Sequence, residues 1–218
     1  MPETTPDTTR SSVVAADREL DPADAGACER LARTLCTRGD DRVDGPEWVS
    51  RARDAWEDLP LLLRREVRRF RRHSGPHGTL VIGGLPVDQA GLPATSTVPG
   101  SVQRQATIPA AVLAMVACGL GEPLAYLAEK SGALVQDVVP VPGQETFHGY
   151  AGSVPLSFHT ENGFHPHPPD HVIFLCLRAD HDRIAGMRVA GIRQARPLLT
   201  PAGREALFAS EYSPADQA

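Results

Sequence analysis

The order of the patterns along this chain constrains its fold more than any other feature. Segments with helical apolar spacing come first, and several short, strand-like apolar runs follow them without helices in between. Helices followed by strands are typical of α+β proteins rather than of alternating α/β folds. The order therefore predicts an α+β protein in which a helical N-terminal part packs on an antiparallel or jelly-roll-like sheet.

Capping residues, first-turn prolines and apolar spacing predict the helices. They are expected from Asp21 to Gly39, from Pro46 through Trp56, from Pro60 to about His73, over Pro109–Cys118, and from Thr200 to about Ser210.

Strand-like runs dominate the remainder of the chain. The first is Thr79–Ile82. Three more follow later in the chain, at Ala133–Val141, Val154–Thr160 and His171–Leu177, and Val189–Ile192 is a candidate for a fourth after these three. Between the first two, residues 86–108 are rich in Pro, Gly, Ser and Thr and predict a long irregular loop.

The domain organisation follows from these segments. Residues 1–20 are polar and predict a disordered tail. Residues 21–218 are expected to form a single domain, helical over 21–75 and β-rich over 76–218.

Composition excludes several classes of protein. The chain has 218 residues, of which 41% are apolar, so it can bury a core. Its net charge is −5, which argues against a nucleic-acid partner, and its apolar runs are far shorter than the ~20 residues of a membrane span. The N-terminus shows no secretory signal, and the four cysteines contain no C-x-x-C pair. We therefore expect a cytoplasmic protein without a membrane partner.

A basic stretch, Arg64–His73, stands out against the acidic total. It could bind an anionic surface. Alternatively, Leu63, Val67 and Phe70 form the apolar stripe of a helix, and the arginines form its solvated face beside acidic neighbours.

The candidate chemistry lies around His159 and Glu161. If Val154–Glu161 is a strand, these side chains point to one face, roughly 6.5 Å apart along the strand. An imidazole and a carboxylate placed so can share a metal ion, and a non-haem Fe(II) site needs two histidines and one carboxylate on one face of the metal. A bare His-x-Glu pair also arises by chance, so the pair alone leaves a structural role open.

The flanking sequence resembles a known family. His159-Thr-Glu-Asn-Gly-Phe-His-Pro, followed by an apolar run and Leu177-Arg-Ala-Asp180, resembles the clavaminate synthase-like branch of the iron(II)/2-oxoglutarate oxygenases, which includes amino-acid β-hydroxylases. Gly132–Val141 and Gly191–Leu199 are similar to the same branch, so the resemblance covers roughly residues 75–212.

This resemblance implies a fold, cofactors and site residues. The fold is a double-stranded β-helix, or jelly roll, and Fe(II) is held by His159 and Glu161 with 2-oxoglutarate as the cosubstrate. The substrate is a small amino-acid-like molecule, and Glu129 lies where related enzymes hold it. The resemblance assigns no further catalytic residue.

The sequence also departs from the family in two ways. The distal iron-ligand histidine and the arginine that binds 2-oxoglutarate normally follow much later than the 57 residues present after Glu161. Met187-Arg188 stands where the family has a cosubstrate-binding threonine. The expected fold is therefore an incomplete jelly roll that lacks its C-terminal third, and the residues that bind the cosubstrate are unassigned.

Other histidines leave alternatives open. Those after the pair are interpreted as loop residues, although one of them could supply the third ligand. His148 and Tyr150 precede the pair and either face the substrate or pack in their loop. The histidines after the pair are His165, His167, His171 and His181.

Two functions of different class follow. The first is an iron(II)/2-oxoglutarate-dependent dioxygenase that hydroxylates an amino acid or an amino-acid-derived metabolite. The second is a non-catalytic remnant, or a binding partner whose fold is completed by a second chain supplying the C-terminal part.

We predict that the isolated 218-residue chain binds Fe(II) weakly and forms succinate from 2-oxoglutarate at or near background. A site with one imidazole and one carboxylate lacks a ligand, and the cosubstrate carboxylate lacks an arginine whose charged hydrogen bonds contribute about 1.5–3 kcal/mol each. The measurement is iron-dependent succinate formation, with His159→Ala as the control. Robust turnover that this substitution abolishes would contradict the prediction.

Overall fold

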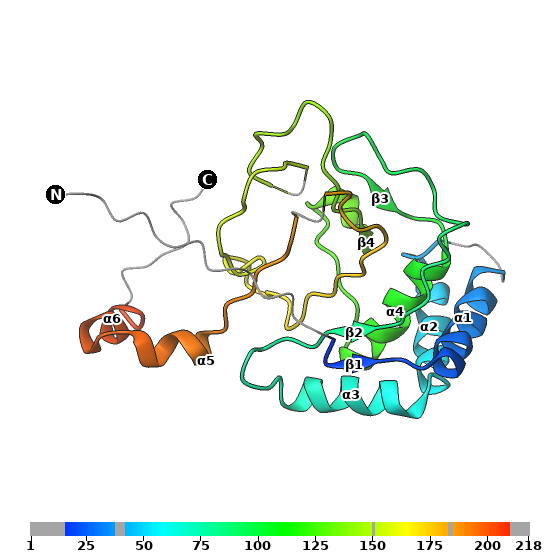
Figure 1. Cartoon of the computed structure of the whole chain (residues 1–218), viewed down its shortest axis with the longest axis horizontal. Helices are drawn as coiled ribbons and strands as arrows, with labels where there is room; N and C mark the ends of the chain where they lie inside the picture. The colour runs from blue at the N-terminus through cyan, green and yellow to red at the C-terminus, as the bar shows by residue number, and fades with distance from the viewer. Residues whose placement is uncertain (1–15, 38–41, 150, 183–184, 210–218) are drawn as a thin grey trace.

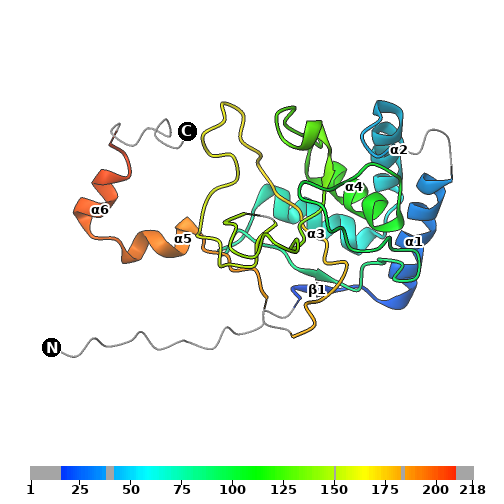
Figure 2. The same ribbon diagram turned by 90° about the horizontal axis from the view of Figure 1, so that it is seen from above.

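The computed structural model describes residues 16–37, 42–149, 151–182 and 185–209. Helices α1 to α4 gather on one side of the molecule, whereas the long loops and the short helices α5 and α6 extend to the other (Figure 1). The view from above shows the same separation (Figure 2). The structure thus joins a compact helical part to a more open part with few strands.

The helix starts predicted from capping residues are confirmed. The Asp21 carboxylate accepts a hydrogen bond from the Asp24 amide at 2.8 Å, and the Thr200 hydroxyl accepts one from the Gly203 amide. Thr107 caps a third helix, which begins at Ile108 rather than at the predicted Pro109. The helices are α1 (Pro22–Cys36), α2 (Pro46–Glu57), α3 (Leu61–Arg72), α4 (Ile108–Leu120), α5 (Ile192–Ala195) and α6 (Pro201–Ala206), with short 3₁₀ turns at Lys130–Gly132 and Arg196–Leu198.

Helix α4 is the centre of the core. It is apolar on all sides, and α1, α2 and α3 all pack against it. Val112 and Met115 of α4 are buried beside Trp48 of α2 and Leu63 of α3. The Trp48 indole also donates a hydrogen bond to the Leu35 carbonyl of α1 at 3.2 Å, which satisfies its polar edge inside the core. No helix within the described residues is long and apolar enough to cross a membrane.

Two small sheets connect this core to the loops. Strand β1 (Arg18–Glu19) pairs in parallel with β2 (Ile82–Gly83), and β3 (Val102–Gln103) pairs antiparallel with β4 (Val135–Gln136). Of the tail predicted to be disordered, residues 1–15 lie outside the described residues. Residues 16–20, in contrast, are fixed by β1, and Leu20 is buried in the core.

The predicted strands are largely wrong in the described structure. Among the described residues, strand forms only at Ile82 of Thr79–Ile82 and at Val135–Gln136 of Ala133–Val141, and Val189–Ile192 ends in the first residue of α5. Val154–Thr160 and His171–Leu177 form no strand. A strand requires a hydrogen-bonded neighbour, and these segments pair with none among the described residues. The loop predicted over residues 86–108 is confirmed for 86–101, which contain neither helix nor strand, but Val102–Gln103 forms β3 and Ile108 begins α4.

The arginines of α3 form a solvated face, as the second of the two alternatives predicts. Arg64 and Arg68 pair with Glu57, and Arg69 pairs with Glu66. Leu63 and Val67 lie on the opposite, buried side of the helix. The acidic neighbours Glu57 and Glu66 therefore pair with three of the six arginines that the sequence concentrates here.

The close contact between α4 and α2 gives a test of the core. A Cβ atom added at Gly119 would overlap the Trp56 ring, which is almost completely buried. We expect Gly119→Ala to lower the free energy of unfolding by about 1–3 kcal/mol, measured by urea denaturation, because the ring must move. Gly121→Ala is the matched control, since its Cβ would meet open space, and it should change stability by less than about 0.5 kcal/mol. Equal effects of the two substitutions would contradict the packing described here.

Candidate functional site

His159 and Glu161 lie close together, although no strand carries them. His159 belongs to an extended segment, and Glu161 begins the turn that follows it. The His159 Nε2 atom lies 3.9 Å from the Glu161 Oε2 atom, and both side chains are about half exposed. The expected common face is therefore present, but it is an open surface rather than the interior of a sheet.

A backbone contact orients the His159 ring. The His159 Nδ1 atom lies 2.8 Å from the Ser157 carbonyl oxygen, an arrangement in which Nδ1–H donates and Nε2 keeps its lone pair. Metal-binding histidines commonly use such a contact to fix the ring and its tautomer. The free Nε2 atom is also the one nearest Glu161.

The distance between the two atoms fits a shared ion. Ligand atoms about 2.1 Å from a first-row metal lie about 3 Å apart at right angles and about 4.2 Å apart on opposite sides. The observed 3.9 Å falls between these limits. The pair therefore needs only a small side-chain movement to bind one ion at adjacent positions.

Tyr126 connects this pair to Glu129. Desolvation, followed by the negative charges of Glu129 and Glu161, raises the pKa of the Tyr126 phenol above its ordinary value. The Tyr126 hydroxyl also donates a hydrogen bond to the His167 carbonyl at 2.7 Å, which ties the loop after the His159–Glu161 pair to the segment containing Glu129.

Glu129 sits at the start of a tight turn. Its amide donates to the Tyr126 carbonyl at 2.9 Å, and its carbonyl accepts from the Gly132 amide at 2.9 Å. Glu129 is half-buried. The turn that contains Glu129 is thus joined through Tyr126 to the loop that follows the His159–Glu161 pair.

The remaining histidines make contacts of their own. The His165 ring stands edge-on to Tyr126 with centroids 4.5 Å apart, and the His171 ring contacts Phe70 with centroids 5.8 Å apart. His148 and His181 are exposed in loops, and Tyr150 lies outside the described residues. Among the described residues, no group of three or more His, Cys, Asp or Glu side chains is arranged to hold a metal. None of these histidines therefore completes the His159–Glu161 pair.

Sequence reasoning missed Tyr126. It is one of three tyrosines in a chain with only 5% aromatic residues, and this scarcity was the available signal. Its contacts depend on two loops that meet only in the folded chain.

Three comparisons relate the chain to known proteins. The chain is 55% identical over 196 residues to the L-asparagine oxygenase of Streptomyces coelicolor, an alignment that covers 90% of this chain and 59% of the relative. It is 33% identical to clavaminate synthase 2 of Streptomyces clavuligerus over 77% of this chain and 52% of the relative. No protein-family model matches the chain.

A solved structure supports the same relationship. The structure of an asparagine oxygenase in complex with Fe(II), 3-hydroxyasparagine and succinate matches with a TM-score of 0.85 and 55% identity, over 88% of this chain and 60% of that chain. The chain therefore spans about three fifths of the length of this enzyme.

Proposed function

Because the chain is homologous to the clavaminate synthase-like iron(II)/2-oxoglutarate oxygenases that act on amino acids, we propose that it forms part of such a hydroxylase. In this proposal His159 and Glu161 bind iron, and Glu129 binds the substrate. The incomplete jelly-roll core and the cytoplasmic location expected from the sequence remain parts of the proposal.

The geometry of His159 carries the proposal. Its Nδ1 atom is engaged by the Ser157 carbonyl, so its Nε2 atom is left to a ligand 3.9 Å from the Glu161 carboxylate. Iron and 2-oxoglutarate, when bound, supply the oxidising chemistry. The protein supplies ligands and orientation.

Glu129 provides a chemical reason for an amino-acid substrate. A half-buried carboxylate can form charge-assisted hydrogen bonds with the ammonium group of an amino acid. The Glu129 amide binds the Tyr126 carbonyl, and the Tyr126 hydroxyl binds the loop after Glu161, so in this proposal a substrate held by Glu129 rests beside the iron ligands. The high identity to an asparagine oxygenase makes asparagine the first substrate to test.

Metal binding by the isolated chain tests the iron ligands without requiring turnover. We expect the chain to bind Co(II), followed by its visible absorption, weakly but measurably. His159→Ala and Glu161→Ala should each lower the affinity tenfold or more, equivalent to about 1.4 kcal/mol, because each removes a ligand.

His73→Ala is the matched control, because it removes another exposed imidazole at the C-terminal end of α3. It should leave the affinity unchanged within twofold. Equal affinities for the wild type and the two ligand variants would contradict the proposal.

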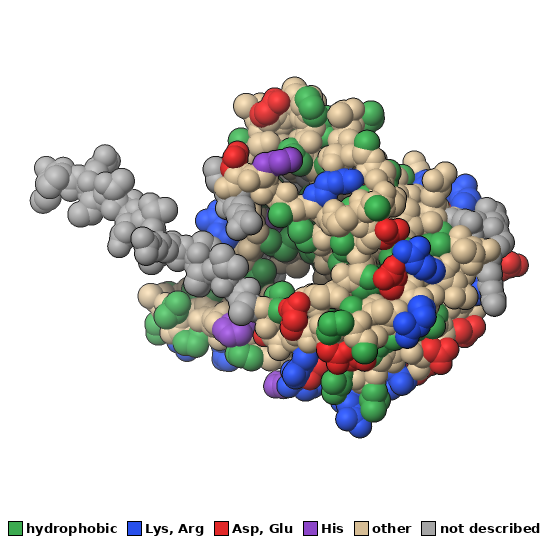
Figure 3. Space-filling view, turned by 45° about the vertical axis from the view of Figure 1, so that its right-hand side comes forward, with side chains coloured by type: hydrophobic (Ala, Val, Ile, Leu, Met, Phe, Trp, Pro, Cys, Tyr) green, Lys and Arg blue, Asp and Glu red, His purple; other side chains and the backbone are tan. Residues whose placement is uncertain are grey.

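An exposed apolar surface favours a second candidate, a chain that docks another polypeptide. Residues 171–177 alternate between half-buried and exposed positions, as a strand does, and Val172 and Phe174 are 48% and 54% exposed. Apolar side chains also line part of a hollow on one face of the molecule (Figure 3). An extended apolar segment without a ladder partner is a site for strand addition.

Contacts at its C-terminal end hold this segment in place. The Gln89 side-chain amide donates to the Leu177 carbonyl at 2.8 Å, and Arg178 donates to the Pro93 carbonyl at 2.8 Å. Hydrogen bonds to loop 86–101 therefore fix the C-terminal end of this segment. We propose that its occupant is an extended, apolar segment of a second polypeptide chain.

Self-association of the isolated chain tests this candidate, because a second copy is then the available partner. Sedimentation velocity should show concentration-dependent association that Phe174→Glu reduces at least tenfold. Leu61→Glu, which changes a similarly exposed apolar residue on α3, should not reduce it. A wild-type chain that stays monomeric at about 100 μM would exclude a partner surface of this kind, because exposed apolar patches promote association.

A further inference from the structure

We propose that Arg104 is a positioning residue for substrate binding: it holds the turn at residues 130–132 and thereby sets the direction of the Glu129 carboxylate. This inference rests on the substrate role proposed for Glu129. Arg104 follows β3 directly and is distant from Glu129 in sequence, so only the folded chain brings them together.

The turn after Glu129 has an unusual backbone. Lys130, Ser131 and Gly132 have φ angles of 42°, 56° and 69°, three left-handed residues in succession. Only glycine adopts this region without a steric cost, so Lys130 and Ser131 need support from outside the turn. Without that support, the chain would relax and the residue before the turn would change direction.

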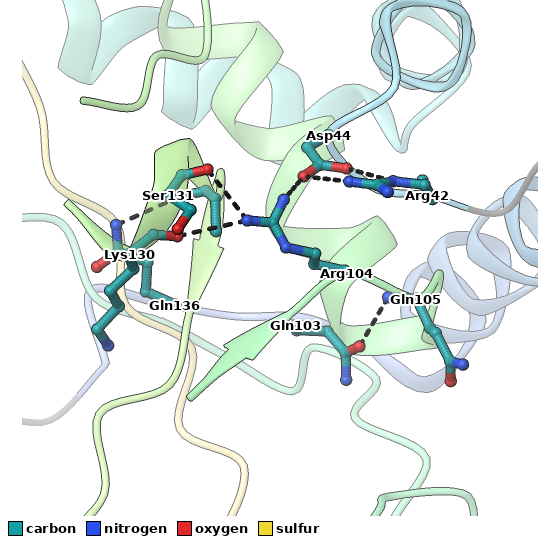
Figure 4. Close-up of polar contacts among 9 residues, drawn as sticks. Arg42, Asp44, Gln103, Arg104, Gln105, Lys130, Ser131 and Gln136 are labelled. Carbon is teal, nitrogen blue, oxygen red and sulfur yellow. Dashed lines mark hydrogen bonds and ion pairs between the residues drawn. The ribbon is translucent and has the colours of Figure 1, made fainter. Parts of the chain in front are cut away.

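Arg104 supplies contacts to both non-glycine residues. Its Nη2 atom donates to the Ser131 carbonyl at 3.1 Å and to the Lys130 carbonyl at 3.4 Å. Its Nη1 atom forms an ion pair with Asp44 on the opposite side (Figure 4). The planar guanidinium therefore bridges the turn and the connection between α1 and α2.

The far end of this bridge is well anchored. Arg42 donates to both carboxylate oxygens of Asp44, at 3.2 and 3.3 Å. Desolvation raises the pKa of Asp44, but the Arg42 hydrogen bond and the charges of Arg42 and Arg104 outweigh it and lower the pKa below its ordinary value. The neighbouring Val43 is buried, and its amide donates to the Arg104 carbonyl at 3.0 Å. Asp44 is thus a charged, fixed acceptor attached to the core.

The Lys130 side chain adds a second support from the other direction. Its ammonium group donates to the Asp137 carbonyl at 2.9 Å and to the Ser101 carbonyl at 3.3 Å. The turn is therefore held through its backbone by Arg104 and through a side chain by the ends of β3 and β4. Arg104 is the part of this arrangement that connects it to the helical core.

Hydrogen exchange tests the hold on the turn directly. We expect Arg104→Ala to increase exchange of the Gly132 and Ala133 amides at least tenfold, because both donate within the turn, and to leave exchange in α1 to α4 unchanged. Arg104→Lys should restore part of the protection, since an ammonium group can reach one of the two carbonyls. Arg53→Ala is the control, because it removes an arginine ion pair with Glu122 elsewhere on the surface. Unchanged exchange at Gly132 in Arg104→Ala would overturn the inference.

Binding of asparagine tests the consequence. In calorimetric titrations with Co(II) and 2-oxoglutarate present, Arg104→Ala should weaken asparagine binding at least tenfold while Co(II) affinity stays within twofold. Arg104→Lys should recover part of the loss. Glu129→Gln should weaken asparagine binding equally but leave exchange in the turn unchanged.

The outcomes separate the inference from the proposed function. If the wild type and Glu129→Gln bind asparagine alike, or neither binds it, the substrate role of Glu129 fails and the positioning role fails with it. If the wild type binds asparagine and Glu129→Gln does not, but Arg104→Ala binds as well as the wild type, the inference alone is overturned.

Discussion

The need to cover α4 on every side organises this molecule. A helix that is apolar around its whole circumference is unfavourable at a surface, and three helices bury most of it, leaving residues such as Leu113 and Ala117 half-buried. Trp48 and Trp56 contribute much of the cover because their rings are large, and Gly119 lets Trp56 approach the α4 backbone closely. Val43 and Asp44, which come just before α2, are fixed as a result, since Val43 is buried in this core.

The candidate site depends on this core through polar contacts rather than through continuous secondary structure. Arg104 links the connection at Asp44 to the turn after Glu129, and Tyr126 links the same loop to the segment that follows Glu161. Each link crosses between loops distant in sequence. The geometry of the site therefore depends on a few side-chain hydrogen bonds, each of which contributes modestly to stability.

The sequence predicted the helices well because their signals are local. Asp21 and Thr200 cap helices through residues three positions away, so a short window of sequence contains the whole interaction.

Strands were predicted poorly because their signal is not local. Residues 171–177 keep the alternation that suggested a strand, yet no neighbour completes a ladder among the described residues. His159 and Glu161 lie close together as predicted, although a loop segment and a turn carry them instead of a strand. The contacts of Tyr126 and Arg104 could not be predicted, because their partners are distant in sequence.

The position of Lys130 has a practical consequence. It is the single lysine in a chain whose other basic residues are arginines, and its amine is engaged by two carbonyls in the turn. Opening the turn would release this amine from both carbonyls and expose it to solvent. An acylating reagent would therefore modify one side chain, and the rate of that reaction would report directly how often the turn beside Glu129 opens.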